Sequence, residues 1–183
     1  AGDITNFGPL EPVDSVLSRF EVPCFAIPGN CDPREIIDVL ERSDTICLHN
    51  SWIALGKITL AGFGGSNTTP FGTPFELTEE EIDSELTRIV NHMDRNIHNV
   101  LLSHAPPYGV LDSVGENHVG SRSIRKHMTR FDLICCAHIH EARGIVEVDG
   151  VRVVNPGPAS EGYGALVHLG KEPQDIDIEL ISV

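Results

Sequence analysis

The chain has 183 residues, of which 40% are hydrophobic and 22% are charged, which is an ordinary composition for a soluble globular protein and excludes a disordered or fibrous class. A net charge of −14 argues against a nucleic-acid partner, because nucleic-acid binding needs clustered Lys and Arg. There is neither an apolar run of the roughly 20 residues that a membrane span needs nor a leader-like start. We therefore expect one domain, residues 1–183, in the cytoplasm and without a membrane partner.

The cysteines number five and form no C-x-x-C pair, which favours a reducing, cytosolic setting. In so acidic a chain, a phosphate-bearing substrate needs a local source of positive charge. Bound metal ions provide that charge without changing the charge of the sequence.

Strands and helices alternate in the first part of the chain. Residues 13–20 have helical spacing of apolar side chains, and residues 23–27 form a short apolar run that predicts a buried strand. Asp32, followed by Pro33, predicts the N-cap of a helix that extends to about Arg42. Two β-type runs, 51–55 and 57–61, flank Gly56 and predict a hairpin.

The second part of the chain begins with a long polar loop, residues 66–75. Thr78 and Glu81 form a capping box that predicts a helix to about Met93. Strands at 100–103 and 133–136 flank a helix predicted at 121–130, and the remaining runs, 145–148, 151–154, 165–169 and 176–181, are all of β type. This order predicts an α/β sandwich of two sheets with the helices outside.

Residues with metal-binding or phosphate-binding side chains follow three of the predicted strands directly. Asn30, Cys31 and Asp32 follow the first strand, His104 the second, and His138 and His140 the third. Ligands bind beyond the carboxyl ends of strands in α/β sheets, so these side chains should meet in one crevice, with Asp3 as a further contributor. Imidazole, carboxylate and amide donors suit Mn, Fe, Zn, Ni or Co, whereas a structural zinc site would need clustered thiolates.

The ordered motifs resemble those of the calcineurin-like metallophosphoesterases, which read D-x-H, G-D, G-N-H-[DE], a lone His after a strand, and G-H-x-H. The matching segments here are Gly2-Asp3, Gly29-Asn30-Cys31-Asp32, Ser103-His104 and Ala137-His138-Ile139-His140. Shorter matches occur at Gly64-Gly65-Ser66-Asn67, Ala105-Pro106-Pro107 and Asn155-Pro156-Gly157.

The resemblance implies an α/β/β/α sandwich of two mixed sheets flanked by helices, and a metal-dependent phosphoesterase that uses a metal-bound hydroxide. It implies two divalent ions, manganese among the candidates, and a small phosphate ester as substrate. Asp3 would bridge the ions, Asn30, His104 and His138 would complete the second site, and His140 would belong to the first. The catalytic residues would be Asn30, Cys31 and His104.

Two departures from the family pattern stand out. The given sequence contains no D-x-H motif before Gly2-Asp3, and a truncated start and a true absence of the motif and its strand both stay open. Without that motif the first metal site is expected to lack two ligands. Cys31 replaces the usual His, as in the branch that resembles bacterial and archaeal phosphodiesterases and in the retromer subunit of the same fold. A thiol is a poor proton donor near pH 7, which favours phosphodiesters over monoesters.

Several alternatives stay open. The chain could be a phosphoesterase-like scaffold that binds proteins, and a homo-oligomer is an option. Asn30 could be a turn residue, Asp32 is expected mainly as a helix cap, and Glu79 to Glu81 as a solvated helix start.

Asn67, His118 and Arg122 are candidate substrate contacts. Gly120-Ser121 opens a helix whose N-terminus could meet an anion near Arg122 or Arg125, and an ordinary capped helix is an equal alternative. Residues 68–75 could form a lid, a dimer contact or a plain surface loop. The other His residues, 49, 92, 98, 127 and 168, are expected to be structural or on the surface, and Cys135-Cys136 to lie in the core.

Overall fold

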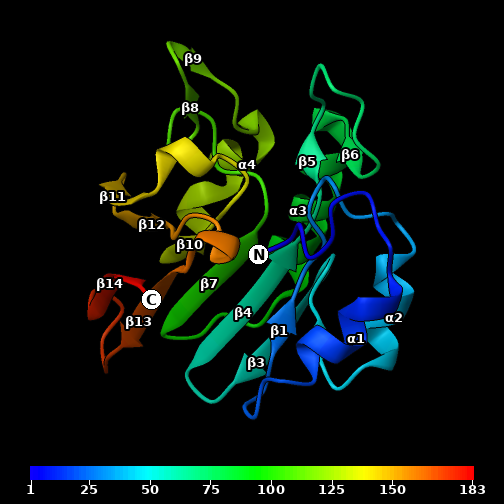
Figure 1. Ribbon diagram of the computed structural model, residues 1–183. Coiled ribbons are helices and arrows are strands. Elements are labelled where there is room, and N and C mark those ends of the chain that lie inside the picture. Colours follow the sequence, from blue (N-terminus) through cyan, green and yellow to red (C-terminus); the bar gives the residue numbers. More distant parts are fainter.

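The computed structural model describes residues 1–183, and its centre is a six-stranded mixed sheet in the order β11-β12-β10-β7-β4-β3 (Figure 1). The four middle strands run parallel, and an antiparallel strand closes each edge. The strands are β3 (Ser51–Leu55), β4 (Ile58–Phe63), β7 (His98–Ser103), β10 (Leu133–Cys135), β11 (Gly144–Val148) and β12 (Val151–Asn155).

Four further strand pairs and seven helical segments surround this sheet. The paired strands are β1 (Phe25–Ala26) with β2 (Ile46–Cys47), β5 (Ser66–Asn67) with β6 (Glu76–Leu77), β8 (Ser113–Val114) with β9 (Asn117–His118), and β13 (Tyr163–Leu169) with β14 (Ile176–Ser182). The α-helices are α1 (Glu11–Leu17), α2 (Ile36–Arg42), α3 (Glu79–His92) and α4 (Arg122–His127). The 3₁₀ helices are η1 (Met128–Arg130), η2 (His140–Ala142) and η3 (Ala159–Glu161).

Helices α3 and α4 cover one face of the large sheet and bury the main core against it. The capping box predicted at the start of α3 is present, with Thr78 accepting from the Glu81 backbone and the Glu81 side chain accepting from Thr78. Apolar residues of α3 recur at helical spacing and are buried, among them Ile82, Leu86 and Ile89. They belong to a cluster of 17 buried residues that includes side chains of β4, β7, β10 and β12.

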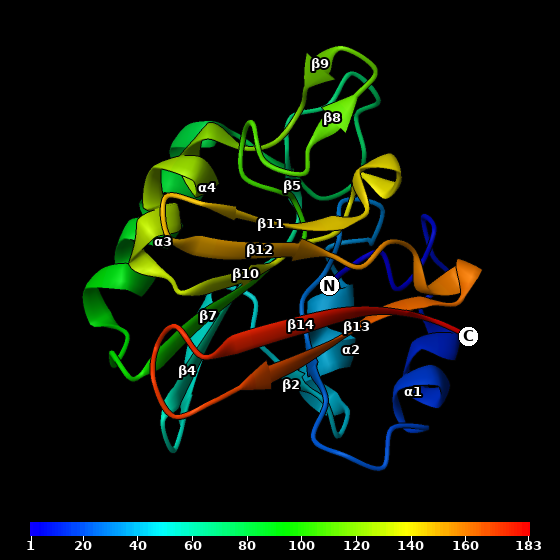
Figure 2. The same ribbon diagram turned by 90° about the vertical axis from the view of Figure 1, so that its left-hand side faces the viewer.

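The opposite face of the sheet is covered by β13–β14 and by the β1–β2 layer with α1 and α2 outside it (Figure 2). Val100, Leu133 and Val154 point to this face and pack with Ile176 of β14. Helices α1 and α2 pack on β1 through a smaller cluster of 5 buried residues. The mixed α/β class is therefore confirmed, and the second β layer consists of two separate two-stranded pairs.

Three predicted helices differ from the structure in their boundaries. The helix expected at residues 13–20 is α1, which spans Glu11–Leu17. Helix α2 begins at Ile36 with Glu35 at its N-cap, and neither Asp32 nor any other side chain caps it. Asp32 was thus wrongly predicted as a cap: its carboxylate accepts hydrogen bonds from the backbone of Ile4, Thr5 and Gly29. The helix predicted at 121–130 is divided into α4 and η1.

All five cysteines are free thiols, and Cys136 lies in the main core while Cys135 packs at the edge of the opposite cluster. None of the helices combines the length and the apolar character required to span a membrane.

Candidate metal centre

Two of the predicted site residues follow neighbouring parallel strands of the large sheet. Strands β7 and β10 pair in parallel, with Leu102 opposite Cys135 near their ends. His104 therefore emerges beside the segment that carries His138, and the centroids of the two imidazole rings are 5.0 Å apart. His138 has a φ of 69°, in the left-handed region that only a closely constrained loop imposes on a non-glycine residue.

Asp3 and Asn30 reach the same place from loops rather than from the large sheet. The segment around Asp3 lies directly against Gly29, where a Cβ atom would come within 2.1 Å of Asp3 N and Oδ1, so only glycine fits. The backbone N–H of Cys31 donates to Asp3 Oδ1 over 2.9 Å. As a result, ligand atoms of Asp3, His104 and His138 all lie within 4.8 Å of one another.

The hydrogen-bond partner of His104 Nδ1 fixes the tautomer of the neutral ring and leaves Nε2 without a proton. Nδ1 is 2.7 Å from the carbonyl oxygen of Ala1, which can only accept, so Nδ1 carries the hydrogen. In the neutral ring, Nε2 then presents a lone pair. That lone pair faces Asn30 Oδ1 at 2.9 Å and Asp3 Oδ2 at 3.5 Å, so three acceptor atoms converge. A cation is the group that satisfies such an arrangement.

Both imidazoles of the cluster are neutral at physiological pH. Burial lowers the pKa of His104 to about 4. Burial, reinforced by the neighbouring His104, lowers the pKa of His138 to about 4. Metal ligation requires the neutral imidazole, so the donor set fits a divalent metal ion.

Cys31 borders the cluster as a protonated thiol. Burial and the negative charge of Asp3 raise the pKa of Cys31 to about 11. At neutral pH the thiol therefore neither acts as a thiolate ligand nor releases its proton readily.

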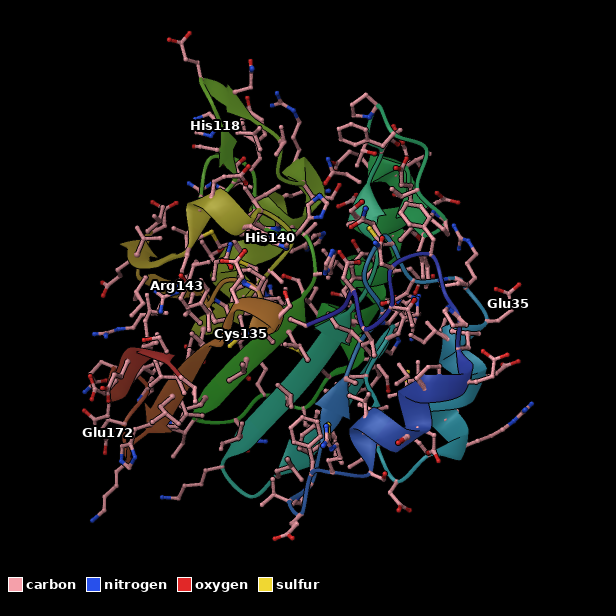
Figure 3. The ribbon with its side chains drawn as sticks, in the orientation of Figure 1. Glu35, His118, Cys135, His140, Arg143 and Glu172 are labelled. Atoms are coloured by element: carbon pink, nitrogen blue, oxygen red, sulfur yellow. The ribbon has the colours of Figure 1, made fainter.

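A cavity of about 620 Å³ opens beside the cluster, bounded by chain segments 1–6 and 155–160 and by Cys31, His104, His138 and His140. His140, labelled in Figure 3, is exposed and lines this cavity outside the three-residue cluster. The structure thus brings Asp3, Asn30, His104 and His138 together and leaves His140 at the border.

The candidate substrate residues lie apart from the cluster, around the β8–β9 hairpin. Asn67 Nδ2 donates to Val119 O over 3.1 Å and joins β5 to this hairpin. His118, labelled in Figure 3, pairs with Ser113 in the β8–β9 hairpin and places Nδ1 2.7 Å from the buried carboxylate of Asp112. The guanidinium of Arg122 lies 4.0 Å from the centre of the Tyr108 ring. None of these three predicted residues lines the cavity.

The N-terminus of α4 does bind an anionic group, which is the side-chain carboxylate of Glu79. The Glu79 carboxylate accepts from the backbone of Arg122 and Ser123 and from the Ser121 hydroxyl. Of the two alternatives left open for this terminus, the structure favours the ordinary capped helix, in which Ser121 accepts from Ile124 N. Glu79, expected in a solvated helix start, is half-buried and bonded to α4. Local sequence could not reveal this contact, because Glu79 and Arg122 are 43 residues apart.

Sequence analysis also missed residues that hold the site in place. Thr73 accepts a hydrogen bond from Asn30 Nδ2 over 3.0 Å, and Glu76 in turn accepts from Thr73. Asp112, which orients His118, was missed as well. Thr73 and Asp112 lie in loops, Glu76 begins β6, and none of the three matches a motif. The only signal was the predicted polar loop at residues 66–75, which contains Thr73.

In this mixed α/β fold, a carboxylate, an amide and two imidazoles meet beside the ends of β7 and β10 and form a site that can hold a divalent metal ion for hydrolysis. The sequence profile of the calcineurin-like phosphoesterase family matches residues 1–142. The chain belongs to this family, as its motifs predicted. Members bind divalent metals, and the Asp3, His104 and His138 cluster is the candidate site for one.

Two curated proteins are similar to this chain in sequence. An uncharacterized protein of Methanocaldococcus jannaschii, MJ1162, is 41% identical over 172 residues, which cover 87% of this chain and 76% of the relative. A UPF0046 protein of Caenorhabditis elegans is 30% identical over 110 residues, or 57% of this chain and 37% of that protein.

Solved structures share the fold at lower sequence identity. One crystal structure has a TM-score of 0.76 at 22% identity and covers 94% of this chain and 70% of its own. TT1561 of Thermus thermophilus has a TM-score of 0.68 at 19% identity, with 97% of this chain and 83% of its own covered. Family and fold together support a metal-dependent phosphoesterase.

Proposed function

We propose that this protein is a metal-dependent phosphodiesterase acting on a small phosphate ester, with a divalent ion held by Asp3, Asn30, His104 and His138. One observation carries the proposal: acceptor atoms of Asp3, Asn30 and His104 converge with no proton between them. When bound, the ion would polarise the phosphoryl oxygen and activate water. Manganese is the ion to test first.

The chain's own residues would hold and orient the reacting groups. His104, with Nδ1 tied to Ala1 O, presents Nε2 in a fixed direction. The cavity beside the cluster offers about 620 Å³ for a substrate and is bordered by His140. His140 is the residue we assign to a second ion. Asn67, His118 and Arg122, which do not line the cavity, would contact only a substrate group that extends beyond it.

The preference for diesters rests on Cys31. Its thiol lies at the cavity with a pKa raised to about 11 by burial and by Asp3, so proton donation to a leaving group would be weak. Esters with good leaving groups need little protonation. Aryl and activated alkyl phosphodiesters are therefore the substrates that this site fits.

The test is hydrolysis of bis(p-nitrophenyl) phosphate by the metal-stripped protein after addition of Mn²⁺, Ni²⁺, Co²⁺ or Zn²⁺. We expect activity only with metal, and a loss of at least about 100-fold in kcat for His138→Ala and Asn30→Ala. His92→Ala is the matched control, because His92 is an exposed residue at the end of α3. Metal-independent turnover, or full activity in His138→Ala, would contradict the proposal.

A further inference from the structure

The Asn30 side chain is anchored on the side away from His104. Its Nδ2 lies 3.0 Å from Thr73 Oγ1, while its Oδ1 lies 2.9 Å from His104 Nε2. An amide that rotates by 180° exchanges these two atoms and would present N–H groups to a cation. Which way this amide faces therefore decides whether Asn30 is a ligand.

A chain of hydrogen bonds fixes that direction. Glu76 Oε1 lies 2.6 Å from Thr73 Oγ1, and an ionised carboxylate can only accept, so the Thr73 hydroxyl donates its single hydrogen to Glu76. The Thr73 oxygen then has only lone pairs left for Asn30. Asn30 must direct Nδ2 toward Thr73 and Oδ1 toward His104.

The loop that carries this chain is itself firmly held. Glu76 also accepts from the backbone N–H of Thr69 and of Thr73. Burial alone would raise the pKa of Glu76, yet the hydrogen bonds from Thr69 and Thr73 hold it at about 2, so the carboxylate is ionised at neutral pH. The backbone of Phe75 donates to Asn30 O over 3.0 Å. The same short segment thus holds both the main chain and the side chain of Asn30.

We propose that Thr73, oriented by Glu76, is a positioning residue that fixes the Asn30 amide with its oxygen toward the metal site. The proposal rests on the proposed function in so far as Asn30 binds a metal. Outer partners of metal ligands typically contribute 10–100-fold to metal affinity or activity. Loss of the Thr73 hydroxyl should weaken Mn²⁺ binding by about 10-fold or more, because the amide is then free to rotate.

The experiment compares three variants of the full chain by Mn²⁺ titration calorimetry and thermal unfolding. Thr73→Val keeps the shape and removes the hydroxyl, and we expect Mn²⁺ affinity to fall about 10-fold with a near-normal Tm. Thr73→Ser restores the hydroxyl and should restore affinity to within about 3-fold. Thr68→Val is the matched control, since Thr68 is an exposed residue of the same loop, and its affinity should not change.

A second readout does not need the metal. In the metal-free protein, the side-chain amide NMR signal of Asn30, assigned with Asn30→Asp, should shift in Thr73→Val and keep its position in Thr68→Val. Wild-type Mn²⁺ affinity in folded Thr73→Val would overturn the positioning role. If the wild-type protein binds no metal at all, the proposed function fails, and an unshifted amide signal in Thr73→Val would overturn the contact itself.

Discussion

The two sides of the candidate metal centre are built in different ways. His104 and His138 follow neighbouring strands of the six-stranded sheet and lie above a cluster of 17 buried residues. Asp3 and Asn30 lie in loops beside β1, whose own cluster has 5 buried residues. Packing of the sheet positions the imidazoles, whereas the loop residues need another means of support.

Carboxylates provide that support on the loop side. Asp32 is fully buried and accepts from Ile4 N, Thr5 N and Gly29 N. These bonds fix the two residues that follow Asp3 and the residue that precedes Asn30. Glu76 holds the loop that orients Asn30. A small core is therefore sufficient for a precise site where carboxylates accept hydrogen bonds from several backbone N–H groups.

The largest effect is expected from Asp32→Ala. Three backbone N–H groups would lose their acceptor, at about 1–3 kcal/mol for each donor left unsatisfied, so we expect a loss of about 4 kcal/mol in the free energy of unfolding. Mn²⁺ binding should be lost as well, because Asp3 would no longer be held against Gly29. Urea unfolding and calorimetry measure the two effects. Asp44→Ala, at an exposed position, is the control, and equal behaviour of both variants would refute the comparison.

Ile134→Ala tests the sheet side. Ile134 is fully buried in β10, so its truncation leaves a cavity and should lower the free energy of unfolding by about 3 kcal/mol. Mn²⁺ affinity of the folded protein should stay within about 3-fold, because the backbone of β10 keeps its partners on both sides. Ile134→Val, which removes one methylene group, should cost about 1 kcal/mol. A marked loss of Mn²⁺ affinity in folded Ile134→Ala would show that the strand pairing of β10 does not by itself hold the imidazoles in place.

His49 lies between the sheet side and the loop side of the metal centre, and its protonation should break its hydrogen bond to the end of β4. Its Nδ1 accepts from the Gly64 backbone over 3.0 Å at the end of β4, and Gly65 N donates to Pro28 O. Burial lowers the pKa of His49 to about 4 from its ordinary 6.5. Between pH 4 and pH 6.5, His49 binds more protons in the unfolded chain than in the folded protein. Its contribution to the free energy of unfolding is therefore complete above pH 6.5 and declines as the pH falls toward 4.

The matching variant is His49→Asn, whose side-chain oxygen can accept from Gly64 without titrating. Between pH 7.5 and pH 4.5, its unfolding free energy should fall by about 2 kcal/mol less than that of the wild-type protein. Urea unfolding at the two pH values gives this difference. Identical pH profiles would mean that folding does not lower the pKa of His49.

Cys31→His is expected to disturb the structure least, and it tests whether the loop side of the metal centre sets the preference for diesters. A histidine at this cavity position offers a proton near neutral pH, so p-nitrophenyl phosphate monoester hydrolysis should rise about 10-fold, with stability almost unchanged. The rate with bis(p-nitrophenyl) phosphate serves as the internal reference. An unchanged ratio of diester to monoester rates would show that the thiol of Cys31 does not set the preference.

Local patterns in the sequence determined most of the framework. The capping box of Thr78 and Glu81, the hairpin around Gly56 and the all-β end of the chain are present as predicted. These features depend on residues close in sequence, so their physical cause can be read directly from the chain. The motif order also placed His104 and His138 after strands, and parallel pairing of those strands then brings the two rings together.

Only the tertiary structure decided what the carboxylates do. Asp32 accepts from Thr5, which is 27 residues away, and Glu79 accepts from Arg122, which is 43 residues away. Glu76 accepts from Thr73, which in turn accepts from Asn30, 43 residues before Thr73. A carboxylate at a helix start has the same local pattern whether it caps its own helix or accepts donors from a distant segment. The choice depends on which donors the fold buries nearby without another partner, and no local pattern contains that information.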